Sequence, residues 1–345
     1  MSYSIEDVAN EAGVSIATVS RVINNSSHAV SEKTRKKVEK AIKKLDYKPN
    51  ISAQTLRQSY TNVIAFIARD LSDAYYGEMA RGITEAAISR EVLSFVCNTG
   101  RKTDDEMRYH ELFNQYRIRG LILGGGGFDT EAYKNNLRDE VEKYKSRNLR
   151  IVALAPQGIE MDSVMIDNSE ASKKMTEYLV DHGHKNILYV GGPANVCTVK
   201  ERLKGFKLVL QEHNIPINKK LIIHTDNTWK GSYETVSEVL KSGHEFTAVF
   251  CDNDNVALSV MRAIQDFGLS VPEDISVVGM GGLPNSQYSS PQLTTIKIPL
   301  YEIGAKAVET VLTTKDYPNT VEKLLFSTEI REGSSVKSII SNENK

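Results

Sequence analysis

The sequence predicts a small all-α unit at the N-terminus, followed by a larger α/β body with parallel sheets. Apolar residues in the first 45 positions recur at helical spacing. After Tyr60, short β-branched runs alternate with helix-length amphipathic segments. The charge also divides, because residues 1–60 hold ten Lys/Arg against six Asp/Glu while the remaining 285 hold 33 against 38. A basic headpiece on a mildly acidic body suits a nucleic-acid partner for the headpiece alone, although a solvated basic helix explains the charge equally well.

Three short helices are predicted within residues 1–49. Ser4 is an N-cap with Asp7 at the capping-box position, and Gly13 supplies the turn before the next helix. Ser15 begins the second helix and Ser31 the third, each followed by an apolar stripe at helical spacing. A helix, a glycine-containing turn and a second helix with an exposed first turn form a helix-turn-helix arrangement.

In that arrangement the first turn of the second helix enters the major groove of DNA. Arg21 is the long side chain with several donors on this surface, so we expect it to read a guanine edge. Ile16 and Ala17 offer apolar contact, while Thr34 and Tyr47 would hold phosphates. A three-helix bundle without a DNA role is the alternative, but folding alone does not require the polar groups to share one face. The expected DNA contacts of residues 1–49 are Ser15, Ile16, Ala17, Thr18, Ser20, Arg21, Asn24, His28, Thr34 and Tyr47.

Nine strand-like runs follow Tyr60, from "NVIAFIA" to "ISVVGM". This is more strands than a single domain of this class usually contains. We therefore expect two lobes. Ligands of open α/β sheets bind beyond the carboxyl ends of the strands, where loops and helix N-termini meet. A binding site is expected among those loops.

Several long segments resemble the LacI family of bacterial transcription regulators, and the resemblance extends nearly to the C-terminus. They include "SIEDVANEAGVSIATVSRVINNSSHAVSEKTRKKVEKAIKKLDYKPN", "GHKNILYVGGP" and "DNDNVALSVMRAIQDFGLSVPEDISVVG". The resemblance implies a homodimeric repressor or activator that binds double-stranded operator DNA, with a periplasmic-binding-protein-like two-lobed body that holds a small, sugar-like effector. The implied divisions are a DNA-binding domain at 1–49, a hinge at 50–60, and an effector-binding and dimerisation domain at 61–340, with an N-lobe of about 61–157 plus 290–318 and a C-lobe of about 158–289 plus 319–335.

The hinge "NISAQTLRQ" begins with Asn50, a good N-cap, and contains Ala53 and Leu56. A helix this short is marginal in water, so it invites folding on binding. In the family that the chain resembles, two such helices pair in the minor groove and a leucine wedges a base step; Leu56 stands at that position. Asn50, Ala53 and Leu56 are therefore expected to touch DNA, and a plain linker is the alternative.

The resemblance also implies effector contacts in the body. Arg202 in "KERLKGF" could fork to two hydroxyls or a carboxylate, or form a surface ion pair with Glu201. Tyr75 and Tyr76 could stack on a ligand or belong to the lobe core. The full set of expected ligand contacts is Tyr75, Tyr76, Gln157, Glu170, Arg202, Asn253 and Asp254.

The sequence departs from the family pattern at two ligand positions. Gly281 and Gly282 stand where sugar-binding members carry a carboxylate pair, and Gln157 stands where an Asp-Arg pair is frequent. A modified sugar, a different metabolite or a partner protein would each fit. "LAPQ" and "IPLYEIGAKAV" resemble the catabolite-control branch, which uses a phosphorylated carrier protein as corepressor, so that reading stays open.

Enzyme signatures are missing from the sequence. The turns "ILGGGGFD" and "VVGMGG" leave a nucleotide-dependent enzyme as an alternative, but they do not fit GxGxxG, and GxxxxGK[ST], GxSxG and HExxH are absent. A binding-protein sensor with a vestigial headpiece is a further alternative. The three cysteines lie far apart, so no metal or cofactor is expected. Without a bilayer-length apolar run or a signal peptide, we expect a cytoplasmic, nucleoid-associated bacterial protein.

Overall fold

A computed structural model describes residues 3–23, 30–48, 60–243, 245–313 and 321–340. The chain divides into two compact units, Met1–Thr61 and Asn62–Lys345. The expected DNA contacts Asn24, His28, Asn50, Ala53 and Leu56 lie outside the described residues.

The first unit is a bundle of three helices, as the capping signals predict. The Ser4 hydroxyl accepts a hydrogen bond from the Asp7 amide, and the Ser4 amide donates one to the Asp7 carboxylate, which completes the capping box. Gly13 ends the first helix with φ +64°, a conformation that costs glycine little. The core includes Val8 and Val19, both fully buried. The helices are α1 (Ile5–Ala12), α2 (Ile16–Ile23) and α3 (Glu32–Lys44).

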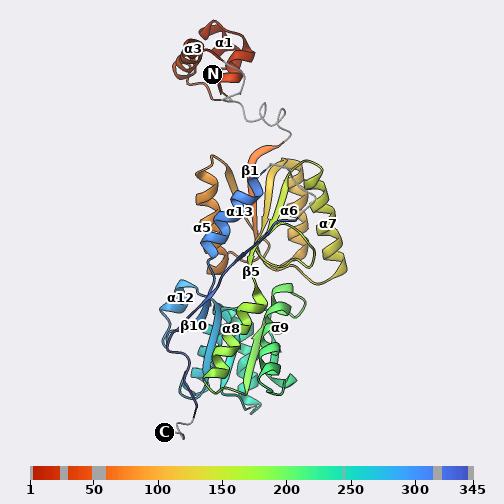
Figure 1. The fold of residues 1–345 in the computed structure, drawn as a ribbon, viewed down its shortest axis with the longest axis vertical. Helices are drawn as coiled ribbons and strands as arrows, with labels where there is room; N and C mark the ends of the chain where they lie inside the picture. The colour runs from red at the N-terminus through yellow and green to blue at the C-terminus, as the bar shows by residue number, and fades with distance from the viewer. Residues whose placement is uncertain (1–2, 24–29, 49–59, 244, 314–320, 341–345) are drawn as a thin grey trace. The chain divides into compact units, whose positions relative to one another are not determined.

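The second unit, the body, contains two lobes, each built around a six-stranded sheet (Figure 1). The sheet of the first lobe has the strand order β11-β5-β4-β3-β1-β2. Its pairs β1–β2, β3–β4, β4–β5 and β5–β11 are parallel, as the buried β-branched runs predict. The strands are β1 (Thr61–Ala68), β2 (Leu93–Asn98), β3 (Ile118–Leu123), β4 (Arg150–Ala153), β5 (Ser163–Ile166) and β11 (Lys323–Phe326), and the helices are α5 (Ala74–Ile88), α6 (Thr103–Tyr116), α7 (Glu131–Lys145) and α13 (Leu300–Leu312).

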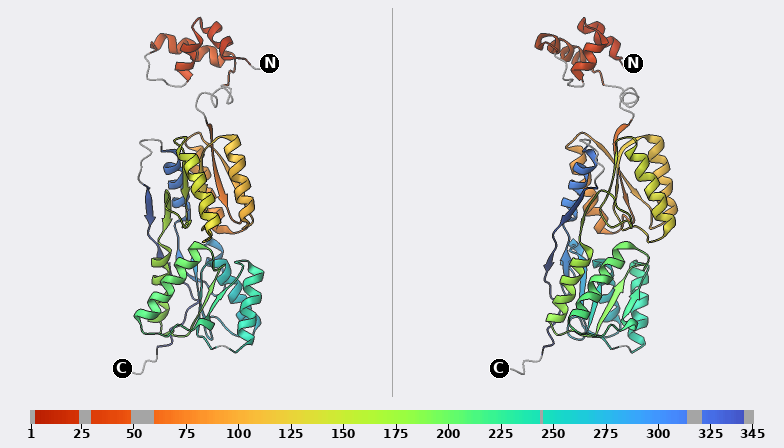
Figure 2. Two further views of the ribbon diagram at one scale, coloured as in Figure 1. Left: turned by 90° about the vertical axis from the view of Figure 1, so that its right-hand side faces the viewer. Right: turned by 45° about the vertical axis from the view of Figure 1, so that its right-hand side comes forward.

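The sheet of the second lobe has the order β12-β10-β9-β8-β6-β7. Its pairs are parallel except for β10 with β12, which is antiparallel. Figure 2 shows the two lobes from two other sides. The elements are α8 (Asn168–Asp181), β6 (Ile187–Gly191), α9 (Cys197–Glu212), η1 (Lys219–Leu221), β7 (Ile222–His224), α10 (Trp229–Lys241), β8 (Ala248–Cys251), α11 (Asp254–Asp266), β9 (Ser276–Gly281), α12 (Pro284–Gln287), β10 (Thr294–Lys297) and β12 (Glu329–Arg331).

Helix pairs in both lobes pack with their backbones in contact at glycines. A Cβ at Gly82 of α5 would lie 2.1 Å from the carbonyl oxygen of Tyr301 in α13. In the second lobe, a Cβ at Gly205 of α9 would lie 2.1 Å from the carbonyl oxygen of Ser169 in α8. Since real Cβ atoms do not approach so closely, any side chain at these positions would push the helices apart.

The lobe boundaries differ from those expected. Strand β5 pairs with β4 in the first sheet, so the first crossing between lobes follows Ile166 rather than residue 157. Strand β10 lies in the second sheet, although 290–318 was expected in the first lobe, and β11 lies in the first sheet, although 319–335 was expected in the second. These strands have four residues or fewer, and their position is set by pairing with residues far along the chain. The remaining crossings therefore fall after Lys297 and after Phe326.

Candidate functional site

The first candidate surface is the exposed first turn of α2. Ser15 fixes this turn, because its Oγ accepts a hydrogen bond from the Thr18 amide at 3.2 Å and lies 2.9 Å from the Thr18 hydroxyl. Ile16 is 44 % exposed, although it is a large apolar residue, and Ala17 and Arg21 are also exposed. None of these three side chains takes part in the bundle core, so all three are accessible to a partner, and their contact with DNA stays a prediction.

The second part of this surface is α3 and the turn that follows it. Ser31 caps α3, and its Oγ lies 2.8 Å from the Thr34 hydroxyl. Tyr47 packs against the bundle core with its side chain half-buried, so its position is fixed. The exposed side of α3 carries lysines that could approach phosphates, namely Lys33, Lys36, Lys37, Lys40 and Lys43.

The body holds a cavity of about 170 Å³ between its two lobes. An apolar cavity of about 150 Å³ accommodates benzene, so this volume suits one substituted six-membered ring. Both lobes contribute to its wall. The lining residues are Arg69, Asp73, Tyr75, Tyr76, Arg101, Gly124, Gly125, Gly126, Phe128 and Ala155 from the first lobe, and Pro193, Val196, Thr198, Val199, Arg202, Asp226, Asn227, Asp252 and Asn253 from the second.

Arg202 is the central cation of the second lobe's wall. It is 8 % exposed; its Nε donates to the Asn168 side chain at 2.9 Å, and its Nη1 donates to the Asp252 carbonyl oxygen. Burial raises the pKa of the Asp252 carboxyl, and the nearby Arg202 charge partly opposes this shift. The guanidinium is therefore held in one orientation, which rules out the surface ion pair with Glu201.

Tyr75 and Tyr76, at the start of α5, both line the cavity, and their rings meet edge to face with centroids 5.4 Å apart. Burial raises the pKa of Tyr76 to about 12 and also raises that of Tyr75, a shift that the nearby charge of Arg202 in the other lobe partly opposes. Both phenols therefore stay protonated near neutral pH. They present hydroxyl groups and ring edges to a ligand.

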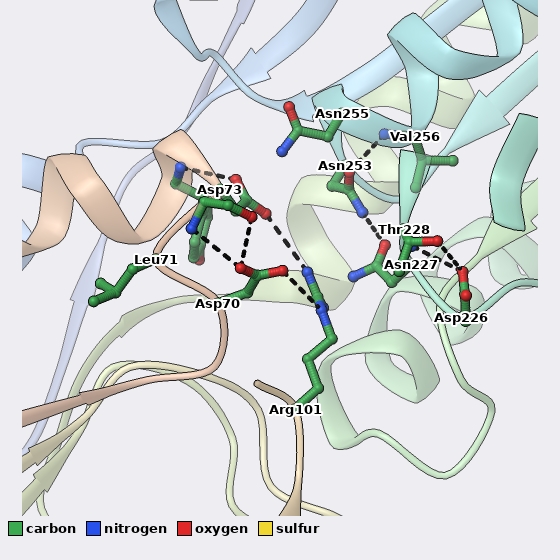
Figure 3. Close-up of polar contacts among 12 residues, drawn as sticks. Asp70, Leu71, Asp73, Arg101, Asp226, Asn227, Thr228, Asn253, Asn255 and Val256 are labelled. Carbon is green, nitrogen blue, oxygen red and sulfur yellow. Dashed lines mark hydrogen bonds and ion pairs between the residues drawn. The ribbon is translucent and has the colours of Figure 1, made fainter. Parts of the chain in front are cut away.

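Polar side chains of the two lobes face one another across the cavity (Figure 3). On the first lobe, Arg101 lies 3.5 Å from the Asp70 carboxylate and 4.0 Å from that of Asp73. On the second lobe, Asn253 caps α11 through the Val256 amide at 2.8 Å and donates its own amide hydrogen to Asn227. Such planar donors and acceptors, next to aromatic rings, are the groups that recognise polyhydroxylated ligands.

The floor of the cavity is the run Gly124–Gly126, where each glycine touches a different neighbour. A Cβ at Gly124 would lie 2.5 Å from the Phe66 ring, and one at Gly125 would lie 2.6 Å from the Arg69 side chain. A Cβ at Gly126 would lie 2.7 Å from the Thr198 hydroxyl of the second lobe. The floor can therefore be made only of backbone, which lets the lobes and Arg69 approach it closely.

One side of the cavity is closed by backbone contacts between the lobes. Phe128 and Val196 form an antiparallel β-bridge, and the amides of Asp129 and Cys197 donate across it at 2.7 and 2.9 Å. Asp129 also forms ion pairs with Lys134 of α7 and with Lys200 of α9, and these hydrogen-bonded pairs lower its pKa to about 2. We call this set of contacts around Phe128 and Val196 the inter-lobe strap.

Four of the seven expected ligand residues line the cavity: Tyr75, Tyr76, Arg202 and Asn253. The other three lie outside its lining. Gln157 is buried behind the floor, where its amide donates to Gly125 and accepts from Tyr133, and Glu170 is exposed in the first turn of α8. Asp254 is fully buried and accepts hydrogen bonds from the amide of Leu283 and the hydroxyls of Ser286 and Thr295. Gln157 and Asp254 thus hold loops in place rather than face a ligand.

The cavity also contains residues that the sequence reasoning did not name, above all Arg69 and Arg101. Arg69 directly follows strand β1, so the rule that ligands bind beyond strand ends could have identified it. No group of three potential metal ligands occurs among the described residues. Within the same ranges, no helix is long and apolar enough to cross a membrane.

Comparison with known proteins places these two sites in a family. The model of the periplasmic binding proteins and sugar binding domain of the LacI family matches residues 61–325, and that of the bacterial regulatory proteins of the lacI family matches residues 4–50. The chain is 34% identical over 314 residues to catabolite control protein A of Priestia megaterium, covering 89% of this chain and 91% of that protein. It is 33% identical over 308 residues to the HTH-type transcriptional regulator DegA of Bacillus subtilis, covering 89% of each.

A solved structure has the same architecture over almost the whole chain. The lac repressor dimer bound to operator and the anti-inducer ONPF is 27% identical, with a TM-score of 0.82 over 98% of this chain and 100% of that one. A helix-turn-helix unit with an exposed reading face therefore accompanies a two-lobed body with a ligand-sized cavity. The chain belongs to the LacI family of DNA-binding transcriptional regulators.

Proposed function

We propose that the protein is a sequence-specific regulator, most simply a repressor, whose affinity for operator DNA is set by a small sugar-like metabolite bound between the lobes. The observation that carries this is the cavity, which both lobes line with fixed polar groups and aromatic rings. A ligand held by Tyr75 and Asp73 on one side and by Arg202 and Asn253 on the other stabilises one angle between the lobes. Ligand binding and DNA binding are coupled if the ligand makes different contacts in the two arrangements of the lobes.

Exposed apolar side chains of the body offer contacts for a second copy of the chain. They belong to the edge strand β2 and to the helices before and after it in the sequence, and they are Ile88, Leu93, Phe95, Leu112 and Tyr116. Large exposed apolar surfaces mark interfaces, and the related lac repressor was solved as a dimer on its operator. A dimer through this surface would present two α2 faces to a roughly palindromic operator.

The link between the cavity and DNA is proposed to run through residue 60. Strand β1 starts at Thr61 and ends beside the cavity at Ala68, where Arg69 follows. A change of lobe angle would alter the separation of the two β1 starts in a dimer, and hence of the segments 50–60 that precede them. Paired hinge helices in this segment, with Leu56 as the wedge, remain a prediction from the sequence.

The test is a gel-shift and footprint titration of the full chain on its own upstream DNA, with and without a panel of sugars, sugar phosphates and organic acids. We expect a protected, roughly two-fold symmetric site whose affinity changes in one direction with a member of the panel. A phosphorylated carrier protein is included in the panel, since catabolite control protein A is 34% identical to this chain. Indifference to all genomic fragments under every condition would refute the proposal.

A further inference from the structure

We propose that Asp254 and Arg331 are positioning residues that fix the angle between the lobes: together they hold the turn Gly281–Leu283 against two of the chain crossings. The inference rests on the proposed function, because it assigns the step between effector binding and lobe angle. It follows from hydrogen bonds, close backbone contacts and burial at the end of the second lobe that faces the first, where Figure 1 shows α12.

Two chain crossings are short and belong to neighbouring strands of the second sheet. Strand β10 ends at Lys297, and α13 of the first lobe begins at Leu300. Strand β11 of the first lobe ends at Phe326, and β12 of the second lobe begins at Glu329. Strands β10 and β12 pair with each other, with Lys297 opposite Glu329. The two crossings therefore leave the second lobe side by side, and a single support can hold both.

The turn Gly281–Leu283, which ends β9, packs directly on the first of these crossings. Gly281 stands opposite Lys297 in the sheet, and its carbonyl oxygen accepts a hydrogen bond from the Ile298 amide at 3.2 Å. A Cβ at Gly282 would lie 2.7 Å from the Lys297 Cα, and its φ of +70° is one that other residues rarely adopt. A carboxylate side chain therefore does not fit at Gly282 unless the crossing moves.

Asp254, the first residue of α11, holds this turn from inside the lobe. It is fully buried, and its carboxylate accepts hydrogen bonds from the Leu283 amide at 2.7 Å and the Ser286 hydroxyl at 2.9 Å. The Thr295 hydroxyl of β10 donates to the other carboxylate oxygen. Hydrogen bonds to a charged acceptor are stronger than those between neutral groups. One carboxylate thus joins α11, the turn and β10.

Arg331 of β12 holds the same turn from the side of the second crossing. Its guanidinium donates to the Gly282 carbonyl oxygen at 3.1 Å and to the Ser286 hydroxyl oxygen at 2.7 Å. Since Ser286 donates in turn to Asp254, its hydroxyl bridges the guanidinium and the carboxylate. We call Asp254, Ser286 and Arg331 the crossing anchor.

The crossing anchor is connected to the cavity through Asn253. This residue lines the cavity and is the N-cap of α11, so it directly precedes Asp254. A ligand that draws Asn253 toward the first lobe therefore also displaces the carboxylate that holds the turn. Buried polar networks lose much of their strength when one member is displaced, so the anchor favours discrete lobe angles over a continuous range.

The test measures the distance between the lobes in the full chain by double electron–electron resonance. Spin labels are attached in Arg138→Cys on α7 and Lys230→Cys on α10, both exposed positions, with Cys97, the cysteine that is not buried, changed to serine. Labelled chain is diluted with unlabelled chain, so that distances within one copy dominate. We expect a single narrow distance distribution for the chain with an intact crossing anchor.

Variants of the anchor should change this distribution. Arg331→Met removes the donors that hold the turn, so the distribution should broaden and shift by several ångströms. Asp254→Asn should have the same effect, because it replaces an acceptor for the turn with a donor. Arg331→Lys keeps the charge and should restore the distribution in part. The double variant should be no worse than either single one, since both remove the same network.

A control separates positioning from stability. Val236→Ala removes buried methyl groups in the core of the second lobe, away from the crossing anchor, so it lowers Tm. We expect it to keep the original distance distribution. Should Arg331→Met fail to fold, Asp254→Asn and Arg331→Lys decide the question by the same measurement.

Three results would overturn the inference: an unchanged distribution in the anchor variants, an equal broadening in Val236→Ala, or additive effects in the double variant. The measurement uses neither DNA nor effector, so a negative result leaves the proposed function standing. Operator binding, measured by gel shift on the same preparations, tests that function separately. Its absence at every condition would contradict the proposed function without changing the distance result.

Discussion

Replacing Arg202 with methionine tests whether one buried cation holds the second lobe's side of the cavity together. Methionine keeps an unbranched apolar stem but removes the guanidinium, which bonds to the Asn168 side chain and to the Asp252 carbonyl oxygen. The Asp252 carboxylate, 2 % exposed, then loses its neighbouring cation. The variant should lose both effector response and part of its stability.

The cost follows from the buried groups that lose their partner. Leaving buried acceptors without their donor costs about 1–3 kcal/mol, and the Asp252 carboxylate also loses a nearby positive charge. For a body of this size each kcal/mol lowers Tm by about 2–4 °C, so we expect a decrease of roughly 2–12 °C. Burial already raises the pKa of Asp252 above that of an unfolded chain. A carboxyl group whose pKa is raised in the folded protein favours the folded state at pH values below its pKa in the unfolded chain, and it loses this contribution as the pH rises. The loss of stability in Arg202→Met should therefore be smaller at pH 5 than at pH 8.

Thermal unfolding at pH 5 and pH 8 measures the decrease in Tm relative to wild type. The double variant Arg202→Met with Asp252→Asn tests whether the stability is restored. The double variant removes the uncompensated charge, so it should regain most of the lost stability while still failing to respond to an effector. Operator binding should stay near wild type in both. A single variant that unfolds within 1 °C of wild type, or a double variant no more stable than the single, would refute the reasoning.

Three other perturbations address the remaining surfaces. Arg21→Ala should weaken specific operator binding by about 1–3 kcal/mol and relax discrimination at one base pair, measured by gel-shift competition against Lys40→Ala, which should weaken all sequences alike; unchanged discrimination would contradict it. Phe95→Asp should shift the dimer toward monomer in sedimentation velocity, whereas the exposed-surface control Arg138→Asp should not; a stable dimer would move the interface elsewhere. Asp129→Asn should weaken the inter-lobe strap at pH 7 in urea unfolding. Because the Asp129 pKa is about 2 in the folded protein, against 3.8 in the reference state, the difference from wild type should shrink as pH falls from 4 toward 2; a constant difference would exclude the ion pairs as its cause.

The helix-turn-helix unit could be predicted in detail because its signals are local. The Ser4–Asp7 capping box, the Gly13 turn and the Ser31 cap each involve residues within four positions of one another, and the structure confirms all three. The alternation of strands and helices likewise predicted the two-lobed α/β body. Lobe membership of β5, β10 and β11 could not be predicted, since it depends on hydrogen bonds to strands far along the chain.

The residues of the cavity could likewise be predicted only in part. Arg202 and Asn253 could be anticipated from their sequence context, and they do face the cavity. The sequence could not reveal that Gln157 would be engaged by Tyr133, or Asp254 by Thr295, because those partners are 24 and 41 residues away. The strand-end rule could have identified Arg69, but its ion pair with Glu106 and its contact with the Phe128 ring depend on the fold and could not be read from the sequence.

The three-glycine floor restricts how this regulator could acquire a new specificity. A mutation at Gly124–Gly126 inserts atoms where Phe66, Arg69 and Thr198 already stand, so it damages packing before it can redesign recognition. Directed evolution toward another effector should therefore leave these three codons unchanged and diversify the rim of the cavity. There, Tyr75 lies in the first turn of α5 and Asn227 in the loop before α10. Libraries built on the rim should yield responsive clones, and libraries built on the floor should yield mostly misfolded ones.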